Sequence, residues 1–333
     1  MSPDLRRKLF LSLGFALVVY AAFVLWSDFA SLKAALIDFP WMWIIPVTLL
    51  TLGNYVARLL RWHWWLHLLG VPIRLYDTMR IFGIGMMMVM TPGKAGELLK
   101  AYMVRNVAGT PMSTTAPTVV AERLIDGAAM IMLAGIGLFA FPDPRAQSVA
   151  ALVAVVFVIG VAVIQYRPFA LRVLALGEKL PIIKKFAHQI YLMYESSYTI
   201  FKPQHLIPAL LIGLAAWAME GLAYGIVLVG FGAPANVDTF LKAIFIFNIS
   251  TVIGALLALP GGLGGVEGSL IFQSRRLLGL SIASATAAAL LTRFITLWMG
   301  VALGVVSFLL WPDLLAGSEE SEQQTTAEFA KEA

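Results

Sequence analysis

The chain has 333 residues, of which 60% are hydrophobic and 13% are charged, and its mean hydropathy is +0.84. Because soluble domains carry about a quarter charged residues, this composition excludes a soluble domain and indicates a polytopic membrane protein. The net charge of +5 is modest, and the absence of cysteine excludes disulfides, thiolate nucleophiles and cysteine metal sites.

Three apolar runs in the first half, residues 9–26, 40–60 and 117–141, predict full transmembrane helices. The first run follows three basic residues as a signal peptide does, but no small-residue cleavage site follows it, so we interpret it as a retained helix. Residues 61–80, rich in arginine and tryptophan, are interpreted as an interfacial segment. Residues 81–90 are too short to cross a hydrocarbon core of about 30 Å. With residues 98–107 as the return limb, they predict a re-entrant hairpin over 81–107.

The second half predicts full helices at residues 148–166, 206–231 and 283–311, with a basic connector at 167–205. Residues 237–259 are long enough to span, but they can equally form the first limb of a second re-entrant hairpin over 237–280. Residues 317–333 form an acidic, polar tail that we expect to be disordered. The predicted fold class is therefore all-α, with about six full transmembrane helices and two re-entrant hairpins.

Both hairpins turn at a break that is rich in proline and glycine. Proline removes a backbone donor and clashes with the preceding turn, and glycine loosens the backbone. Broken backbone at membrane depth is tolerated only where it is buried in protein or lines a wet cavity. The predicted hinge residues are Pro92, Gly93 and Gly96 in the first break and Pro260, Gly261, Gly262, Gly264 and Gly265 in the second.

Each break is followed by a glutamate and, 26 positions later, by an arginine in an apolar helix. These pairs are Glu97 with Arg123 and Glu267 with Arg293, offset by 170 positions. The match predicts an internal repeat, with residues 1–145 as the first copy and 146–316 as the second. Because each copy holds three full spans, the second copy enters the membrane upside down, which is a transporter architecture.

The distribution of lysine and arginine predicts that both termini are cytoplasmic. With this orientation, 17 of these residues lie in inside segments and 5 in outside segments, with Arg123 and Arg293 left in the membrane. Lys100 and Arg105 could face lipid headgroups on the same side, but we assign them to this topological bias. The predicted location is the cell membrane, either plasma or inner.

The ionisable residues within apolar segments are candidates for function. In the simplest interpretation, Glu97 with Arg123 and Glu267 with Arg293 are structural ion pairs, because a lone buried charge costs several kcal/mol. In a functional interpretation, they line a polar cavity and exchange partners as substrate or protons pass. Lys94, at a glycine-flanked helix start, suits a phosphate group, and a lysine at the cytoplasmic surface is an equal alternative. The predicted substrate-binding or transport residues are Lys94, Glu97, Arg123, Asp126, Glu220, Glu267 and Arg293.

The sequence contains no pattern for nucleotide hydrolysis, for a nucleophile elbow or for a zinc protease. His63 and His67 have a spacing that can ligate a metal, but no third ligand lies near them in the sequence. We therefore expect no catalytic residue, metal or cofactor, and no nucleic-acid partner.

Residues 92–97, 122–126 and 260–267, taken together, resemble the flippase-like, lysylphosphatidylglycerol synthase transmembrane family. This is the membrane half of multiple peptide resistance factor proteins, and the resemblance covers about residues 9–311. It implies that the chain moves a lipid, or a lipid-linked headgroup, between leaflets. Members that make lysylphosphatidylglycerol carry a large soluble synthase domain that this sequence lacks, so aminoacyl transfer is not implied.

We expect an integral membrane lipid transporter that moves an anionic phospholipid or a polyprenyl-phosphate-linked glycan, and not an enzyme. Two alternatives stay open: a membrane-embedded enzyme that acts on a lipid, with Glu97 or Glu267 as acid or base, and a non-transporting partner of a glycosyltransferase. The expected partner is a membrane lipid. The sequence leaves open the lipid's identity, the direction of movement, proton or ion coupling and the oligomeric state.

Overall fold

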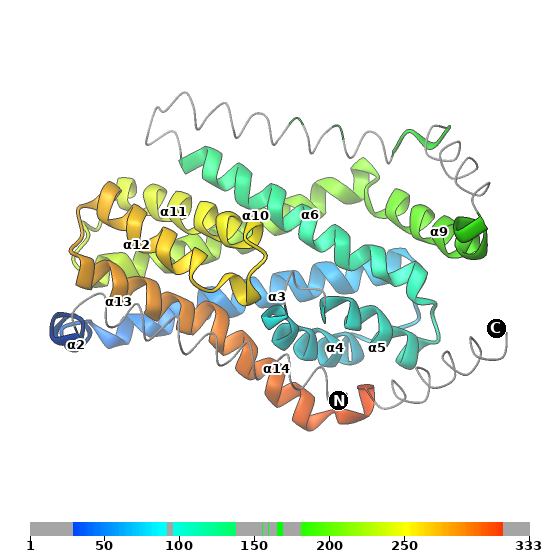
Figure 1. Cartoon of the computed structure of the whole chain (residues 1–333), viewed down its shortest axis with the longest axis horizontal. Coiled ribbons are helices and arrows are strands. Elements are labelled where there is room, and N and C mark those ends of the chain that lie inside the picture. Colours follow the sequence, from blue (N-terminus) through cyan, green and yellow to red (C-terminus); the bar gives the residue numbers. More distant parts are fainter. Residues whose placement is uncertain are drawn as a thin grey trace.

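The structure, a computed structural model, describes residues 29–91, 96–137, 155, 159, 165–168 and 181–315. These residues form helices and the turns between them, with no strand among them, which confirms the predicted all-α fold class. Figure 1 shows long helices packed side by side along the longest axis of the molecule. The predicted helix at 9–26 and the tail lie outside the described residues, as does nearly all of the helix predicted at 148–166.

The first half contains helices of very different lengths. They are α2 (Phe29–Ile37), η1 (Trp41–Trp43), α3 (Ile44–Leu68), α4 (Leu75–Met87), η2 (Met88–Met90), α5 (Leu99–Ala108) and α6 (Met112–Gly137). The second half has the elements α9 (Pro181–Ile200), α10 (Pro203–Gly230), α11 (Val237–Leu256), η5 (Pro260–Gly262), α12 (Gly265–Leu278), α13 (Ile282–Arg293), η6 (Phe294–Trp298), α14 (Met299–Leu310) and η7 (Pro312–Leu315).

Four helical stretches within the described residues are long and apolar enough to cross a membrane, which supports a multi-pass membrane protein. One of them, the 29-residue stretch Ile282–Leu310, is continuous through α13, the π-helical turn η6 and α14. The α11 stretch also qualifies, at 20 residues, so the structure is compatible with either interpretation of residues 237–259. The other two are Trp41–Leu68 and Pro203–Gly230.

The interfacial segment predicted at 61–80 is wrong for residues 61–68, which continue a helix long and apolar enough to cross a membrane. Helix α3 continues to Leu68, and α4 begins at Leu75. Trp62 and Trp65 are fully buried in a core cluster with residues of α4, α5 and α6. Two tryptophans of the predicted interfacial segment therefore pack in the protein core.

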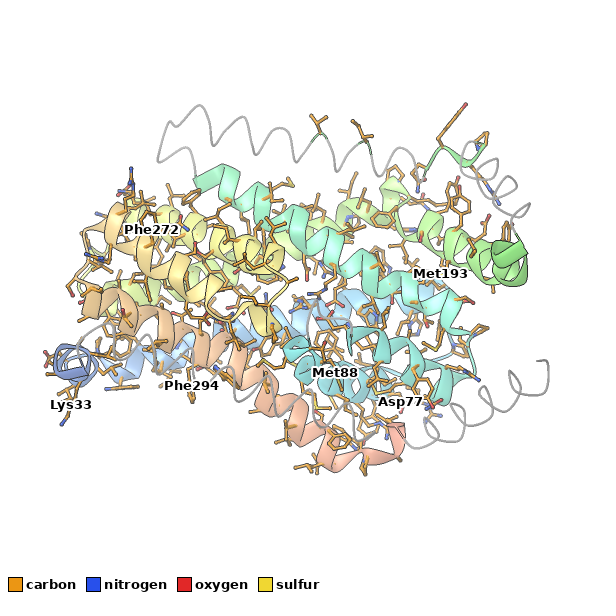
Figure 2. All side chains as sticks on the ribbon, viewed as in Figure 1. Lys33, Asp77, Met88, Met193, Phe272 and Phe294 are labelled. Atoms are coloured by element: carbon orange, nitrogen blue, oxygen red, sulfur yellow. The ribbon has the colours of Figure 1, made fainter. Side chains whose placement is uncertain are left out.

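The turn that precedes the first predicted break packs against the second break near the middle of the molecule. Met90, at the end of η2, packs in one buried cluster with Leu263 beside η5 and with Leu297 and Val301. Figure 2 shows Met88 midway along the molecule, with Lys33 towards one end and Asp77 towards the other. From this middle region α5 and α12 run towards opposite ends of the long axis (Figure 1).

The helices after the two breaks end in the same way. Helix α5 ends at Gly109 and α12 ends at Gly279, each with a left-handed φ of 68°. Each glycine donates its N–H to a carbonyl four residues earlier, that of Arg105 or Arg275. A left-handed residue after a helix strongly favours glycine. These two ends are again 170 positions apart, as are the glutamates and the arginines.

Candidate substrate site

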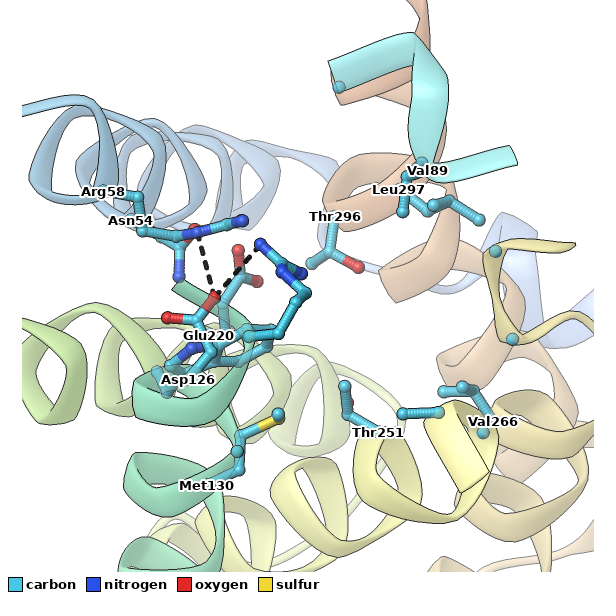
Figure 3. Close-up of a pocket in the computed structure, with 18 of the residues that line it drawn as sticks. Asn54, Arg58, Val89, Asp126, Met130, Glu220, Thr251, Val266, Thr296 and Leu297 are labelled. Atoms are coloured by element: carbon cyan, nitrogen blue, oxygen red, sulfur yellow. Dashed lines mark ion pairs between the residues drawn. The ribbon is translucent and has the colours of Figure 1, made fainter. Parts of the chain in front are cut away.

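A cavity of about 470 Å³ lies between the broken helices. It is lined by residues of α3, α4, α6, α10, α11, η5 and η6. Figure 3 shows Arg58, Asp126 and Glu220 at one side of this cavity, with Thr251, Val266 and Leu297 on the other side. The cavity therefore has a charged part and an apolar part, as a site for an amphipathic molecule requires.

The charged part of the cavity is built on Glu122 of α6, which is 1% exposed. Its carboxylate lies 2.9 Å from Arg58 Nη2, 3.0 Å from Arg123 Nη2 and 2.5 Å from Lys100 Nζ. These three cations come from α3, α6 and α5, so one carboxylate ties three helices together.

Asp126, one helical turn further along α6, holds a second set of cations. Its Oδ1 is 2.5 Å from Arg61 Nη2, and its Oδ2 is 3.5 Å from Arg58 Nε and 3.4 Å from Arg123 Nη2. Glu97, which follows the first break, lies 3.2 Å from Arg123 Nε. We call these seven residues the charge cluster: Arg58, Arg61, Lys100, Arg123, Glu97, Glu122 and Asp126.

The cations of the charge cluster differ in their access to the cavity. The side chains of Arg61 and Lys100 are 0% and 4% exposed, and Arg61 stacks over the ring of Trp65. Arg58 and Arg123 keep 18% and 27% of their side-chain surface exposed, and both line the cavity. Arg58 and Arg123 are therefore the cations that a bound molecule reaches most readily.

A separate ion pair fixes the second break. Arg293 Nε lies 2.7 Å from Glu267 Oε1, and Arg293 Nη2 donates to the carbonyl of Gly261 at 2.5 Å. The other carboxylate oxygen of Glu267 accepts from the N–H of Gly264 at 2.7 Å. Gly261 and Gly264 have φ of 59° and 82°, which glycine adopts without the steric cost of a side chain. Arg293 also lines the cavity, whereas Glu267 is fully buried behind it.

Glu220 of α10 lines the cavity but stands apart from these ion pairs. Its carboxyl is 3% exposed and accepts one long hydrogen bond of 3.5 Å from Thr51 Oγ1. Among the described residues, no cation forms an ion pair with it.

The structure brings most of the predicted site residues together. The contacts Glu97–Arg123 and Glu267–Arg293 are confirmed, and Asp126 joins the first of them. In the first break, the N–H of Gly96 bonds to the hydroxyl of Thr91 at 2.9 Å. The functional roles of all these residues stay predictions. Outside the described residues lie Pro92, Gly93 and Lys94.

Four members of the charge cluster were missed or misassigned. Lys100 was assigned to membrane topology, and this is wrong because it is 3% exposed and paired with Glu122. Arg58 and Arg61 were counted among the 17 basic residues of inside segments, and Glu122 was not chosen as a site residue. Helical spacing was the available signal, because Arg58 and Arg61 are three apart and Glu122 and Asp126 are four apart, which puts each pair on one helix face.

The histidine pair of α3 has a local explanation. The rings of His63 and His67 are 4.3 Å apart, and His63 Nδ1 lies 2.8 Å from the hydroxyl of Thr78. No group of three or more metal-binding side chains occurs in the described part of the chain.

Apolar spanning helices, two breaks that meet at mid-length and a buried charge cluster beside a cavity define an α-helical membrane protein with an internal site. The chain belongs to the family described as the lysylphosphatidylglycerol synthase TM region, which matches residues 11–304.

Three archaeal relatives carry the name UPF0104 membrane protein. One, from Methanothermobacter thermautotrophicus, is 26% identical over 326 residues, which is 91% of this chain and 93% of the relative. A match of 29% identity in the same organism covers 64% of this chain and 68% of the relative. A third, from Methanocaldococcus jannaschii, is 22% identical over a match that covers 66% of this chain and 92% of the relative. These names describe membrane proteins and state no substrate.

Proposed function

We propose that this protein moves an anionic phospholipid, or a polyprenyl-phosphate-linked glycan, between the two leaflets of a membrane. The observation that carries this proposal is the excess of cations in the charge cluster beside an amphipathic cavity. The cluster holds four cations and three carboxylates, so it has one positive charge in excess when all are ionised. An uncompensated charge in a buried site is costly unless a ligand or solvent neutralises it.

A phosphodiester fits the accessible part of this cluster. Arginine presents a planar fork of donors that matches phosphate oxygens. Arg58 and Arg123 offer such donors at the cavity. Arg61 lies behind the cavity wall, and Lys100, although it lines the cavity, is nearly buried and bound to Glu122. The apolar cavity wall near Val89, Val252 and Leu259 then receives the acyl or prenyl chain.

The arrangement of the repeat supports movement across the bilayer. In an inverted repeat, broken helices that meet at the midplane form a substrate site which can open to either side. Here the breaks meet at Met90 and Leu263, and α5 and α12 run in opposite directions from that point (Figure 1). The positions shared at an offset of 170 now include the helix-ending glycines as well as the Glu and Arg pair. We propose that residues 1–145 and 146–316 are inverted copies of one unit.

The Glu267–Arg293 pair is the residue pair through which the second repeat acts on the cavity. Replacement of Glu267 by Gln removes the charge that neutralises Arg293 and weakens the bond to the Gly264 N–H. The turn at Gly261 and Gly262, which lines the cavity, then loses its fixed geometry. Leaflet exchange should therefore fall at least tenfold, since misplacement of a binding group by about 1 Å can cost that much or more.

The test is exchange of a fluorescent phosphatidylglycerol between leaflets of liposomes that contain the purified chain, measured by loss of signal to an impermeant quencher. E195Q is the matched control, because Glu195 pairs with Arg167 away from the cavity. Wild-type exchange by E267Q would remove Glu267 from the mechanism. An absence of exchange by the wild-type protein for both phosphatidylglycerol and a polyprenyl phosphate would overturn the proposed function.

A further inference from the structure

Glu220 is a buried carboxyl that faces the cavity without an ion pair among the described residues. It is 3% exposed, and its one hydrogen bond there, from Thr51, is 3.5 Å long. A carboxyl removed from water must be paired with a cation or carry a proton, because an isolated buried charge is very costly. Every other buried carboxylate at this site, Glu97, Glu122, Asp126 and Glu267, lies within 3.2 Å of a cation.

The groups around Glu220 come from the helices packed against α10. Helix α3 contributes Thr51, Tyr55 and Arg58, and α13 contributes Arg293. Of these residues, the two arginines act on Glu220 electrostatically from a distance. Helix α6 presents Asp126 across the charged part of the cavity (Figure 3). The lining residues of α11 carry no charge.

The surroundings of Glu220 do not suit a metal cation. Sodium, calcium or magnesium needs several oxygen ligands at short distance. Glu220 has one hydroxyl at 3.5 Å, and the described residues contain no cluster of three acidic or histidine side chains that could hold a metal. A proton needs only the carboxyl itself.

We propose that Glu220 is a proton-binding site, and that its carboxyl competes for Arg58 when the proton leaves. In the arrangement described here, Arg58 is engaged by Glu122 and Asp126 and is exposed to the cavity. Loss of the proton to water in the cavity places a negative charge beside Arg58. The charge of the cavity then falls by one, which cancels the single positive excess of the charge cluster.

The consequence, which rests on the proposed lipid function, is that the proton and an anionic headgroup bind together. By linkage, a proton that strengthens lipid binding is itself bound more tightly when lipid is present. The affinity for an anionic lipid should therefore fall as pH rises through the titration of Glu220. A fall of about tenfold is expected, within the usual range for coupled sites.

The first experiment measures the proton directly. Infrared spectra of the full chain in nanodiscs at neutral pH should contain the carbonyl band of a buried carboxylic acid. E220Q should lack this band, and E195Q should retain it, because Glu195 is part of an exposed ion pair. Absence of the band in wild-type protein at every pH near neutrality overturns the proton site, as does its persistence in E220Q.

The second experiment measures coupling, with dioctanoyl phosphatidylglycerol as the probe, by titration calorimetry over the pH range in which the band disappears. Its phosphodiester keeps one charge throughout that range, so a change in affinity reports the protein. Wild type and E195Q should lose affinity with rising pH, whereas E220Q should bind equally at all pH values.

Should E220Q fail to fold, E220D keeps a carboxyl and should keep the pH dependence. A pH-independent affinity in wild type overturns the competition for Arg58. Failure of the lipid to bind at any pH, with the infrared band intact, overturns the proposed lipid function and leaves the proton site standing.

Discussion

Arg58 and Arg61 are one turn apart on α3 and perform different tasks in the charge cluster. Arg61 makes the 2.5 Å bond to Asp126 and is fully buried, whereas Arg58 shares Glu122 and Asp126 with other cations and reaches the cavity. Deletion of Arg61 removes the shortest contact of Asp126 and leaves it with Arg58 and Arg123 at 3.5 and 3.4 Å, which compensates a buried carboxylate poorly. Deletion of Arg58 instead leaves each carboxylate with its shortest ion pair, Glu122 with Lys100 and Asp126 with Arg61. Replacement of Arg61 should therefore mainly lower stability, whereas replacement of Arg58 should mainly lower lipid binding.

We predict that R61M lowers the free energy of unfolding by about 3 kcal/mol, and that R58M changes it by less than about 1 kcal/mol. Lipid binding should show the reverse order, with R58M losing at least tenfold in affinity for dioctanoyl phosphatidylglycerol and folded R61M losing much less. Denaturant unfolding in detergent and calorimetry measure the two quantities. Equal losses of affinity in both variants would contradict the division between a buried and an accessible cation.

The sequence predicted the pairs Glu97–Arg123 and Glu267–Arg293 because each has the same spacing after a break. It did not predict the partners of Asp126, because Arg61 lies 65 positions away on a helix that was expected to end before it. Arginines at the end of an apolar run resemble a membrane boundary. Only the packing of α3 against α6 shows that the run continues and that the charge is internal.

At the scale of elements, α11 and α12 approach closely where Gly254 faces Val266. A methyl group at Gly254 would lie 2.2 Å from the Cγ2 atom of Val266. Both residues line the cavity, so this contact fixes how α11 and α12 pack together beside it. The sequence showed Gly254 in an apolar helix, but the spacing of residues did not indicate that Val266, after the second break, packs against it.

We predict that G254A destabilises the protein by about 1–3 kcal/mol, because overpacking outweighs the better helix propensity of alanine. The double variant G254A/V266A should recover most of this loss, since Val266→Ala removes the clashing methyl group. G135A is the control, because a methyl group there meets nothing within 4 Å. It should be neutral or slightly stabilising in the same unfolding measurement. Additive losses in the double variant would show that the two residues do not touch.

At the scale of the whole molecule, the fold class and the break positions followed from composition and from proline and glycine, whereas the boundaries of the first half did not. Three of the 17 basic residues assigned to inside segments, Arg58, Arg61 and Lys100, belong to the internal charge cluster. Without them the asymmetry is 14 to 5, which still favours cytoplasmic termini. Orientation is therefore a prediction that depends on surface charges alone.

The inverted repeat makes a sharp prediction for Arg105 and Arg275. These residues are equivalent at the offset of 170, and both are exposed. The backbone carbonyl of each accepts a hydrogen bond from the N–H of the left-handed glycine that ends its helix. Since α5 and α12 run to opposite ends of the long axis (Figure 1), the two positions should face opposite sides of the membrane. The chain has no cysteine, so R105C and R275C each introduce a single thiol. An impermeant maleimide added to intact cells should label R275C, and R105C should react only after the membrane is opened. Labelling of both thiols from one side would show that the two copies are parallel, and the site could then not open alternately through inverted halves.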